Sequence, residues 1–252
     1  MTAFEYHRPK SLAEALALLG RGRPLAGGTS LTAERARVSG VVDLQGLSLD
    51  SLEIKAGEVI AGAMLTLEAF AQGCESEAPA LAEAARREAA LNLRNMATVA
   101  GTLVAADGRS PLATVLIAAK AQLTLEPGAE SAPLDRLLER REAMLAGKLI
   151  VAVRIPRPAF LSYLQVGRSP ADLPMVCAAL AREERPSKWS AALGGFGARP
   201  VLLEELPPDP ESAGVVAREA YSGAGDAWAT AEYRAEVAAI LVRRLFQEAQ
   251  AR

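Results

Sequence analysis

Two runs of small and hydroxyl-bearing residues are the parts of this sequence best suited to bind an anion. In PLAGGTSL, residues 24–31, Gly27 and Gly28 stand side by side, and Thr29 and Ser30 follow them. Adjacent glycines adopt positive φ without a Cβ penalty, so consecutive backbone N–H groups can converge on one point and bind a phosphate or pyrophosphate. A tight turn that binds no ligand is the alternative interpretation of the same residues.

The second run, TVAGT, covers residues 98–102 and has a threonine hydroxyl at each end. Two such loops could hold a dinucleotide from two sides. Neither run is one of the common nucleotide motifs, because no third glycine completes G-x-G-x-x-G and no G-K-[ST] follows.

The other residues that commonly carry chemistry are few, which restricts the kinds of site that this chain can build. Cys74 and Cys177 are the only cysteines, and His7 is the only histidine. Two distant cysteines cannot supply the four thiolates that an iron–sulfur cluster usually needs. A histidine-based metal site or a Ser-His-Asp triad would depend on His7. We therefore expect no catalytic side chain and no metal, and a bound organic cofactor as the source of difficult chemistry.

The composition argues against two classes of partner. The 252 residues carry a net charge of −2, with Lys and Arg spread along the chain, unlike the basic patch of a nucleic-acid-binding protein. No apolar run approaches the ~18 residues that a transmembrane helix needs. We expect a soluble, cytoplasmic protein that binds neither nucleic acid nor membrane.

Each of the two runs is expected next to a strand. RPLA precedes the first run and predicts a short strand. Before it, SLAEALALLG predicts a helix over 11–20, which starts with the S-x-x-E capping box of Ser11 and Glu14. The second run lies in ATVAGTLVAADG, residues 97–108, which we interpret as strand-like and then loop.

The rest of the chain alternates between strand and helix patterns and predicts an α+β protein with sections 1–55, 56–158 and 159–252. We predict strands at 4–9, 40–45, 148–158, 160–166 and 188–200, a hairpin over 52–64, and helices over 78–92, 172–183 and 231–250. The strand at 188–200 has a glycine-rich end, GGFG. The last helix is amphipathic, with Val237, Ile240, Leu241, Leu245 and Phe246 on its apolar face.

The chain resembles the FAD-binding medium subunit of molybdenum hydroxylases, a family that includes the flavin subunits of xanthine dehydrogenase and aerobic carbon monoxide dehydrogenase. The resemblance covers nearly the whole chain and rests on FEYHRPKSLAEALALL, LAGGTSL, VVDLQGL, IAGAMLTL, PALAEAARREAALNLRNMATVAGTLV, VAVRIP and DAWATAEYRAEVAAILVRRLF. It implies two subdomains of the vanillyl-alcohol-oxidase (PCMH) type, 1–55 and 56–158, with FAD bound between them. It also implies a C-terminal domain, 159–252, with a three-stranded antiparallel sheet beside helices.

The resemblance also implies cofactor-binding roles. An AGGT(S/D)L loop of the family binds the FAD pyrophosphate through backbone amides, and a T-(I/V)-G-G-N loop binds the other side of the same cofactor. A strand similar to KLIVAVRIP brings an aliphatic side chain to the flavin region. These roles fall on Leu25, Ala26, Gly27, Gly28, Thr29, Ser30 and Leu31, on Thr98, Val99, Ala100, Gly101 and Thr102, and on Ile150.

The sequence departs from the family pattern at the second loop and after it. Ala100 stands in place of the first loop glycine, and it would cost roughly 1–2 kcal/mol if that position required positive φ. Thr102 replaces the asparagine, and Leu164 occupies a position that is polar in relatives. The aspartate that usually follows the loop is absent, and Arg109, Ser110 or Pro111 occupies its place.

Four conspicuous residues outside these loops have structural interpretations. Arg94 and Asn95 in NLRNMAT could be polar groups of an active site, but we expect them to fix a helix-to-loop corner. Trp189 and Trp228 could stack on a flavin, but both fall in the C-terminal section, where we expect them to be structural.

The function implied by the resemblance is that of an oxidoreductase subunit that transfers electrons through FAD. Electrons from a molybdenum centre on a large partner chain would pass through iron–sulfur clusters on a small partner chain, reach FAD here, and leave to an external acceptor. The alternatives are an FAD-free structural subunit that docks such partners and a stand-alone flavin oxidoreductase.

Overall fold

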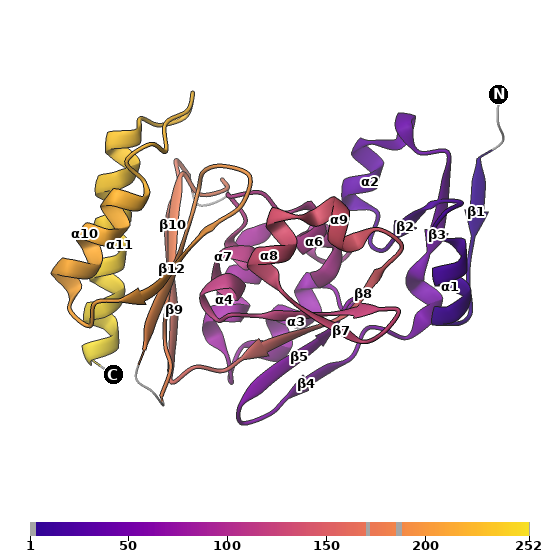
Figure 1. The fold of residues 1–252 in the computed structure, drawn as a ribbon, viewed down its shortest axis with the longest axis horizontal. Helices are drawn as coiled ribbons and strands as arrows, with labels where there is room; N and C mark the ends of the chain where they lie inside the picture. The colour runs from indigo at the N-terminus through magenta and orange to yellow at the C-terminus, as the bar shows by residue number, and fades with distance from the viewer. Residues whose placement is uncertain (1–3, 170–171, 185–187, 252) are drawn as a thin grey trace.

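The chain folds as three consecutive parts, each with its own β-sheet (Figure 1). The computed structural model describes residues 4–169, 172–184 and 188–251. The N-terminal part lies at one end of the molecule in Figure 1, the C-terminal helices lie at the other end, and the second part lies between them. This combination of helices and sheets confirms the expected α+β class.

The first part is a small parallel sheet with strand order β1-β3-β2, against which helix α1 packs. Its elements are β1 (Glu5–His7), α1 (Leu12–Leu18), β2 (Arg23–Leu25), α2 (Thr29–Ala33), η1 (Arg35–Arg37), β3 (Gly40–Asp43) and η2 (Leu44–Leu47). The predicted helix start is confirmed, because Ser11 Oγ accepts a hydrogen bond from the Glu14 N–H at 3.2 Å. The Glu14 carboxylate in turn accepts from the Lys10 N–H at 2.8 Å.

The second part is a five-stranded antiparallel sheet with strand order β4-β5-β8-β6-β7. Its strands are β4 (Leu52–Ile54), β5 (Glu58–Gly62), β6 (Gln122–Glu126), β7 (Glu130–Pro133) and β8 (Leu149–Pro156). Its helices are α3 (Leu67–Cys74), α4 (Pro79–Glu88), α5 (Leu91–Arg94), α6 (Val99–Ala105), α7 (Pro111–Ala118), α8 (Leu134–Glu139) and α9 (Arg141–Leu145). The β4–β5 hairpin forms as predicted, and it spans the expected boundary near residue 55.

The prediction that 97–108 begins as a strand is wrong, because Val99–Ala105 within this segment form helix α6. Thr98 is the N-cap of this helix, and its Oγ1 accepts a hydrogen bond from the Gly101 N–H at 3.1 Å. Val99 and Leu103 are fully buried four residues apart, as on one face of a helix. The cap and this spacing outweigh the strand preference of the β-branched residues. The helix predicted over 78–92 is also interrupted, because α4 ends at Glu88 and Ala89 is extended.

The third part is a four-stranded antiparallel sheet with order β12-β11-β10-β9, where the resemblance implied three strands. The strands are β9 (Phe160–Val166), β10 (Val176–Arg182), β11 (Trp189–Gly194) and β12 (Val201–Leu206), and the helices are α10 (Pro210–Ala220) and α11 (Ala231–Ala251). The helix predicted over 172–183 is wrong, because this segment contains β10.

Strand β10 has no polar alternation because both of its faces are buried. Val176, Ala178 and Leu180 belong to the core beneath α10 and α11. Cys177, Ala179 and Ala181 face the core of the second part, where α7 packs against β10 and β11. A strand buried on two faces is a continuous apolar run, which periodicity alone cannot distinguish from a buried helix.

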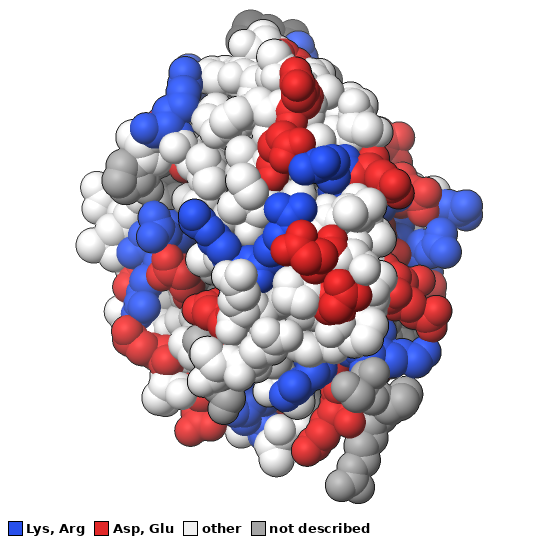
Figure 2. All heavy atoms as spheres, turned by 90° about the vertical axis from the view of Figure 1, so that its left-hand side faces the viewer, with Lys and Arg blue, Asp and Glu red and all other residues white. Residues whose placement is uncertain are grey.

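The predicted C-terminal helix is confirmed as α11, with Leu241, Leu245 and Phe246 buried against the sheet. Ile240 was expected on the same face but is 41% exposed. Figure 2 shows the end of the molecule formed by α10 and α11, where positive and negative side chains are interspersed. Pairs such as Arg218–Glu236, at 2.7 Å, join the two helices. None of the helices in the described ranges is both long and apolar enough to cross a bilayer.

A partly buried carboxyl group joins α4 to the start of α7. The Glu88 carboxylate accepts hydrogen bonds from the Ser110 hydroxyl and the Leu112 N–H, both at 2.9 Å. Burial raises the pKa of Glu88 to about 7, and the negative charge of Asp107 adds to the rise, while the two hydrogen bonds oppose it. Glu88 therefore takes up a proton in the folded protein at a pH where a free glutamate is ionised.

We expect Glu88 to make the protein less stable as the pH rises from about 4.5 to about 7. A carboxyl whose pKa is raised on folding favours the folded state below its unfolded pKa, and this contribution is lost as the pH rises through the folded value. Glu88→Gln should therefore gain about 1–3 kcal/mol in unfolding free energy relative to wild type between pH 5 and pH 8. Urea denaturation at a series of pH values measures this difference. Glu83→Gln, on the same helix, is the control, and parallel profiles for wild type and Glu88→Gln would contradict the prediction.

Candidate cofactor site

A cavity of about 330 Å³ lies between the first and second parts and collects most of the predicted site residues. The loop from β2 into α2 forms one wall, α6 forms another, and Leu149 and Ile150 of β8 add an apolar surface. Of the thirteen predicted residues, ten line the cavity: Ala26, Gly27, Gly28, Thr29, Ser30, Leu31, Thr98, Ala100, Gly101 and Ile150. Its size is within the range of small-molecule sites.

The two adjacent glycines are required for different reasons. Gly28 has φ = 74°, which is the left-handed conformation that the sequence suggested. At Gly27 a Cβ atom would lie 1.8 Å from the carbonyl oxygen of Met96, so the backbone of the loop contacts the chain just before α6 directly. The sequence indicated the first requirement, whereas the second depends on a contact between segments far apart in the chain.

The backbone N–H groups of residues 27–31 have no hydrogen-bond acceptor within the described chain. The same five residues line the cavity and are only partly exposed, except for Ser30, which is exposed. Unpaired amide groups that surround one cavity wall favour an anionic ligand, and Thr29 and Ser30 can add hydroxyl donors. A pyrophosphate matches this set of donors.

The second run, 98–102, presents its atoms differently, because four of its five backbone N–H groups already have acceptors within the chain. The donors at Val99, Ala100, Gly101 and Thr102 go to Leu65 O, Ala63 O, Thr98 Oγ1 and Thr98 O, at 2.8, 3.2, 3.1 and 2.8 Å. This wall therefore offers side-chain and Cα surface to a ligand in place of amide donors. Val99 is buried in the core, and Leu25, Val99 and Thr102 do not line the cavity.

The backbone strain considered for Ala100 is absent. Ala100 lies in α6, and the described non-glycine residues with positive φ are Ser48, Lys120, Ala129 and Glu205. Its side chain is buried, with 7% exposure, at the cavity wall. Alanine at this position therefore narrows the cavity without straining the backbone.

Three charged residues that the sequence did not single out also line the cavity. Arg23 pairs with Glu34, and Lys148, which directly precedes β8, pairs with Glu130. The two cations add positive charge beside the free amides, and the carboxylate partners hold them in place. The sequence signal available for Arg23 and Lys148 was their position, because each is the first residue of a strand predicted beside the site, RPLA and KLIVAVRIP.

The remaining residues of chemical interest lie outside the cavity. His7 pairs with Glu5 on β1 at 2.9 Å. Arg94 pairs with Glu68 at 2.7 Å and donates to the carbonyls of Arg86 and Ala89, which confirms its corner role. Among the described residues, no three His, Cys, Asp or Glu side chains gather as metal ligands. Trp189 packs in the core of the third part, 4.4 Å from the ring of Phe246, as expected.

The fold therefore places a cavity, with unpaired amide groups on one wall, between its first and second parts, and adds a third, C-terminal part. Residues 2–158 match the family described as the FAD binding domain in molybdopterin dehydrogenase. The chain belongs to this family, which confirms the expected family and the expected cofactor, FAD.

Known proteins resemble this chain over part or nearly all of its length. The carbon monoxide dehydrogenase medium chain of Afipia carboxidovorans is 28% identical, over 99% of this chain and 98% of that protein. The 6-hydroxypseudooxynicotine dehydrogenase complex subunit alpha of Paenarthrobacter nicotinovorans is 32% identical, over 62% and 57% of the two chains. The structure of reconstituted CO dehydrogenase from Oligotropha carboxidovorans superposes with a TM-score of 0.84, at 26% identity and over 99% and 98% of the two chains. These similarities confirm the expected oxidoreductase class.

Proposed function

We propose that this chain is the FAD-binding electron-transfer subunit of a molybdopterin-dependent hydroxylase or dehydrogenase. It would accept electrons from iron–sulfur clusters on a partner and pass them to an external acceptor. The observation that carries the proposal is the set of free N–H groups of residues 27–31 on one wall of a mostly apolar cavity. The proposal keeps the cytoplasmic location expected from the sequence.

The residues of the cavity have separate tasks in this proposal. Bound FAD supplies chemistry that accepts electrons singly and releases them in pairs. The amides of residues 27–31 would hold its pyrophosphate, and Arg23 and Lys148 would offset the negative charge. Ile150 and Leu149, which are 6% and 4% exposed, would keep water from the apolar portion of the cofactor. Thr98, Ala100 and Gly101 would limit how deeply the cofactor enters.

The partners in this proposal are a large molybdenum-cofactor subunit and a small iron–sulfur subunit on separate chains. The two cysteines are free and buried, Cys74 in the second part and Cys177 on β10, and neither is placed to ligate a cluster. Iron–sulfur clusters would therefore be supplied by another chain. The relatives of this chain are described as a medium chain and as a subunit of a complex, which supports such an assembly.

An FAD-free docking subunit and a stand-alone flavin oxidoreductase are the competing functions. The unstrained Ala100 and the unpaired amides favour the FAD-containing subunit over the first of these. Cofactor extraction from the purified chain tests the proposal: we expect a yellow protein with a flavin absorption band and close to one FAD per chain. A colourless protein that fails to take up added FAD would contradict it. Co-purification with molybdenum and iron–sulfur subunits distinguishes the stand-alone function.

We expect Lys148→Gln to weaken FAD binding by about 3–10-fold, with a reduced salt dependence. The loss is modest because Lys148 is partly exposed and already pairs with Glu130, so removing its charge removes only part of a screened attraction. Flavin fluorescence titration at two salt concentrations measures the change. Lys188→Gln is the matched control, since Lys188 pairs with Glu205 in the third part, away from the cavity. Equal FAD affinities for the two variants would contradict a role for Lys148.

A further inference from the structure

The segment 106–110 extends the wall of the cofactor cavity toward the third part. Val104 and Ala105, the last residues of α6 before this segment, line the cavity. The segment ends at Ser110, the N-cap of α7. A shift of 106–110 would therefore move the end of α6 and change the shape of the cavity.

The backbone of this segment is bonded to the glycine-rich end of β11. The Gly195 N–H donates to Gly108 O at 2.6 Å, and the Gly108 N–H donates to Gly197 O at 2.9 Å. A Cβ on Gly108 would lie 1.9 Å from the carbonyl oxygen of Phe196, so only glycine allows this approach. The GGFG sequence, residues 194–197, does not line the cofactor cavity. Its backbone instead binds segment 106–110 and so joins the third part to the cavity wall.

Arg109 makes the side-chain counterpart of this contact. Its guanidinium donates to the carbonyls of Leu173 and Pro174, at 3.2 and 3.4 Å, and lies 5.3 Å from the centre of the Trp228 ring. The Asp107 carboxylate accepts from the Arg109 N–H at 2.7 Å and fixes the local turn. Arg109 is one of the residues at the place where the family pattern has an aspartate, and here its side chain reaches the third part.

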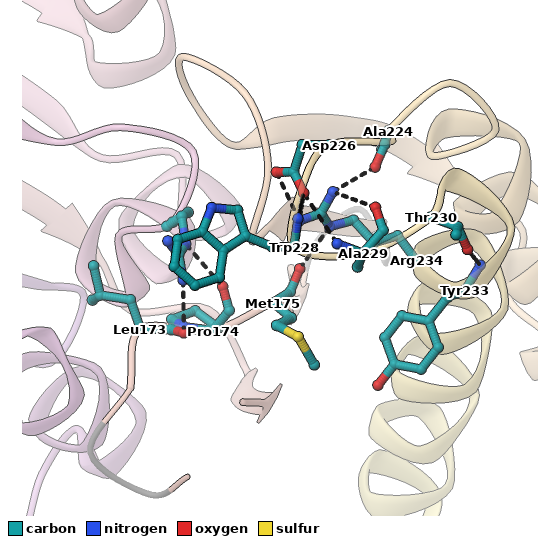
Figure 3. A network of polar contacts seen from close by, with 11 residues as sticks. Leu173, Pro174, Met175, Ala224, Asp226, Trp228, Ala229, Thr230, Tyr233 and Arg234 are labelled. Carbon is teal, nitrogen blue, oxygen red and sulfur yellow. Dashed lines mark hydrogen bonds and ion pairs between the residues drawn. The ribbon is translucent and has the colours of Figure 1, made fainter. Parts of the chain in front are cut away.

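The surfaces that receive Arg109 are held rigidly by a buried arginine (Figure 3). Arg234 is 1% exposed, pairs with both carboxylate oxygens of Asp226 at 2.9 Å, and donates to Met175 O at 3.1 Å. Asp226 in turn accepts from the Trp228 N–H at 2.7 Å. The Arg234 guanidinium therefore holds Met175 directly and Trp228 through Asp226. Arg109 contacts the same Trp228 and the two residues that precede Met175.

We propose that Arg109 is a positioning residue for the cofactor, which acts by holding segment 106–110 and the end of α6 against the third part. The proposal rests on FAD binding in the cavity described above. Arg168 provides a matched comparison, because its guanidinium lies 4.5 Å from the same Trp228 ring. It belongs to the third part itself and makes no hydrogen bond to another described residue, so its removal leaves the contact between the parts intact.

The test compares Arg109→Ala, Arg109→Lys and Arg168→Ala by hydrogen exchange and by FAD titration. We expect amide exchange in 103–110 to be about 10-fold faster in Arg109→Ala, with a Kd for FAD about 5-fold higher and an altered visible circular dichroism of bound flavin. Arg168→Ala should change both quantities by less than about 2-fold, and Arg109→Lys should be intermediate, because lysine keeps the charge but not the fork geometry.

The outcomes separate this proposal from the proposed function. Equal exchange in Arg109→Ala and Arg168→Ala would overturn the proposal, whether or not flavin binds. Faster exchange in Arg109→Ala with an unchanged Kd and unchanged flavin dichroism would also overturn it, since Arg109 would then be structural only. A wild-type protein that takes up no FAD would count against the proposed function instead, and the exchange comparison would still decide whether Arg109 holds the segment.

Discussion

Gly27→Ala is expected to abolish FAD binding and to lower the unfolding free energy by about 3 kcal/mol. The added Cβ would lie 1.8 Å from Met96 O and 2.6 Å from the Met96 carbonyl carbon, so the loop must move away from the chain before α6. That movement would separate the free amides from the opposite wall of the cavity. FAD content after purification and urea denaturation of the apoprotein measure the two effects.

Two other glycines of the first part, Gly28 and Gly20, serve as comparisons for this result. Gly28→Ala should cost about 1–2 kcal/mol, because Gly28 has φ = 74°. Its Cβ would still find space, 3.3 Å from Leu25 Cδ1. Gly20→Ala should have little effect, because nothing lies within 4 Å of the Cβ position. If Gly28→Ala lost more stability than Gly27→Ala, the close approach to Met96 would not be the limiting contact.

Arg234→Met should destabilise the third part by about 3–5 kcal/mol, the largest effect that we expect from any single side chain. The substitution leaves the carbonyls of Met175 and Ala224 without their donor and removes the bidentate pair with Asp226. Denaturation followed by the fluorescence of Trp189 and Trp228 measures the loss.

Arg218→Met is the control for this prediction. Arg218 pairs with Glu236 on the exposed face of α10 and α11, with side-chain exposures of 46% and 50%. An exposed pair contributes at most about 1 kcal/mol, so this variant should stay close to wild type. Similar losses in the two variants would show that the buried network around Arg234 carries no special stability.

Helix starts and turns could be predicted from the sequence wherever a single residue type strongly favours one backbone geometry. Ser11 and Glu14 gave the start of α1, and the glycine pair gave the loop and the positive φ of Gly28. The same approach failed at Thr98, where a cap residue precedes β-branched residues and two local preferences compete. It failed again at β10, since its neighbours on both faces come from distant parts of the chain.

The candidate site was predictable only in part, because a pattern shows which residues are small but not what they touch. The first loop was identified from its glycines, and its residues line the cavity. The second run was expected to bind the other side of the cofactor, yet the N–H groups of residues 99–102 are already bonded to Thr98, Ala63 and Leu65. What Arg23, Lys148 and Arg109 contact becomes visible only when the three parts are placed together.

The burial of β10 on two faces has a consequence for shortened versions of this protein. All eight residues of α7 are buried, and β10 and β11 cover one side of this helix. The family match ends at residue 158, before both of those strands. A chain cut at that point would leave α7 uncovered and should bind hydrophobic dyes and aggregate. Residues 2–158 match the family on their own. We expect them to stay in solution only together with the β9–β12 sheet that follows them.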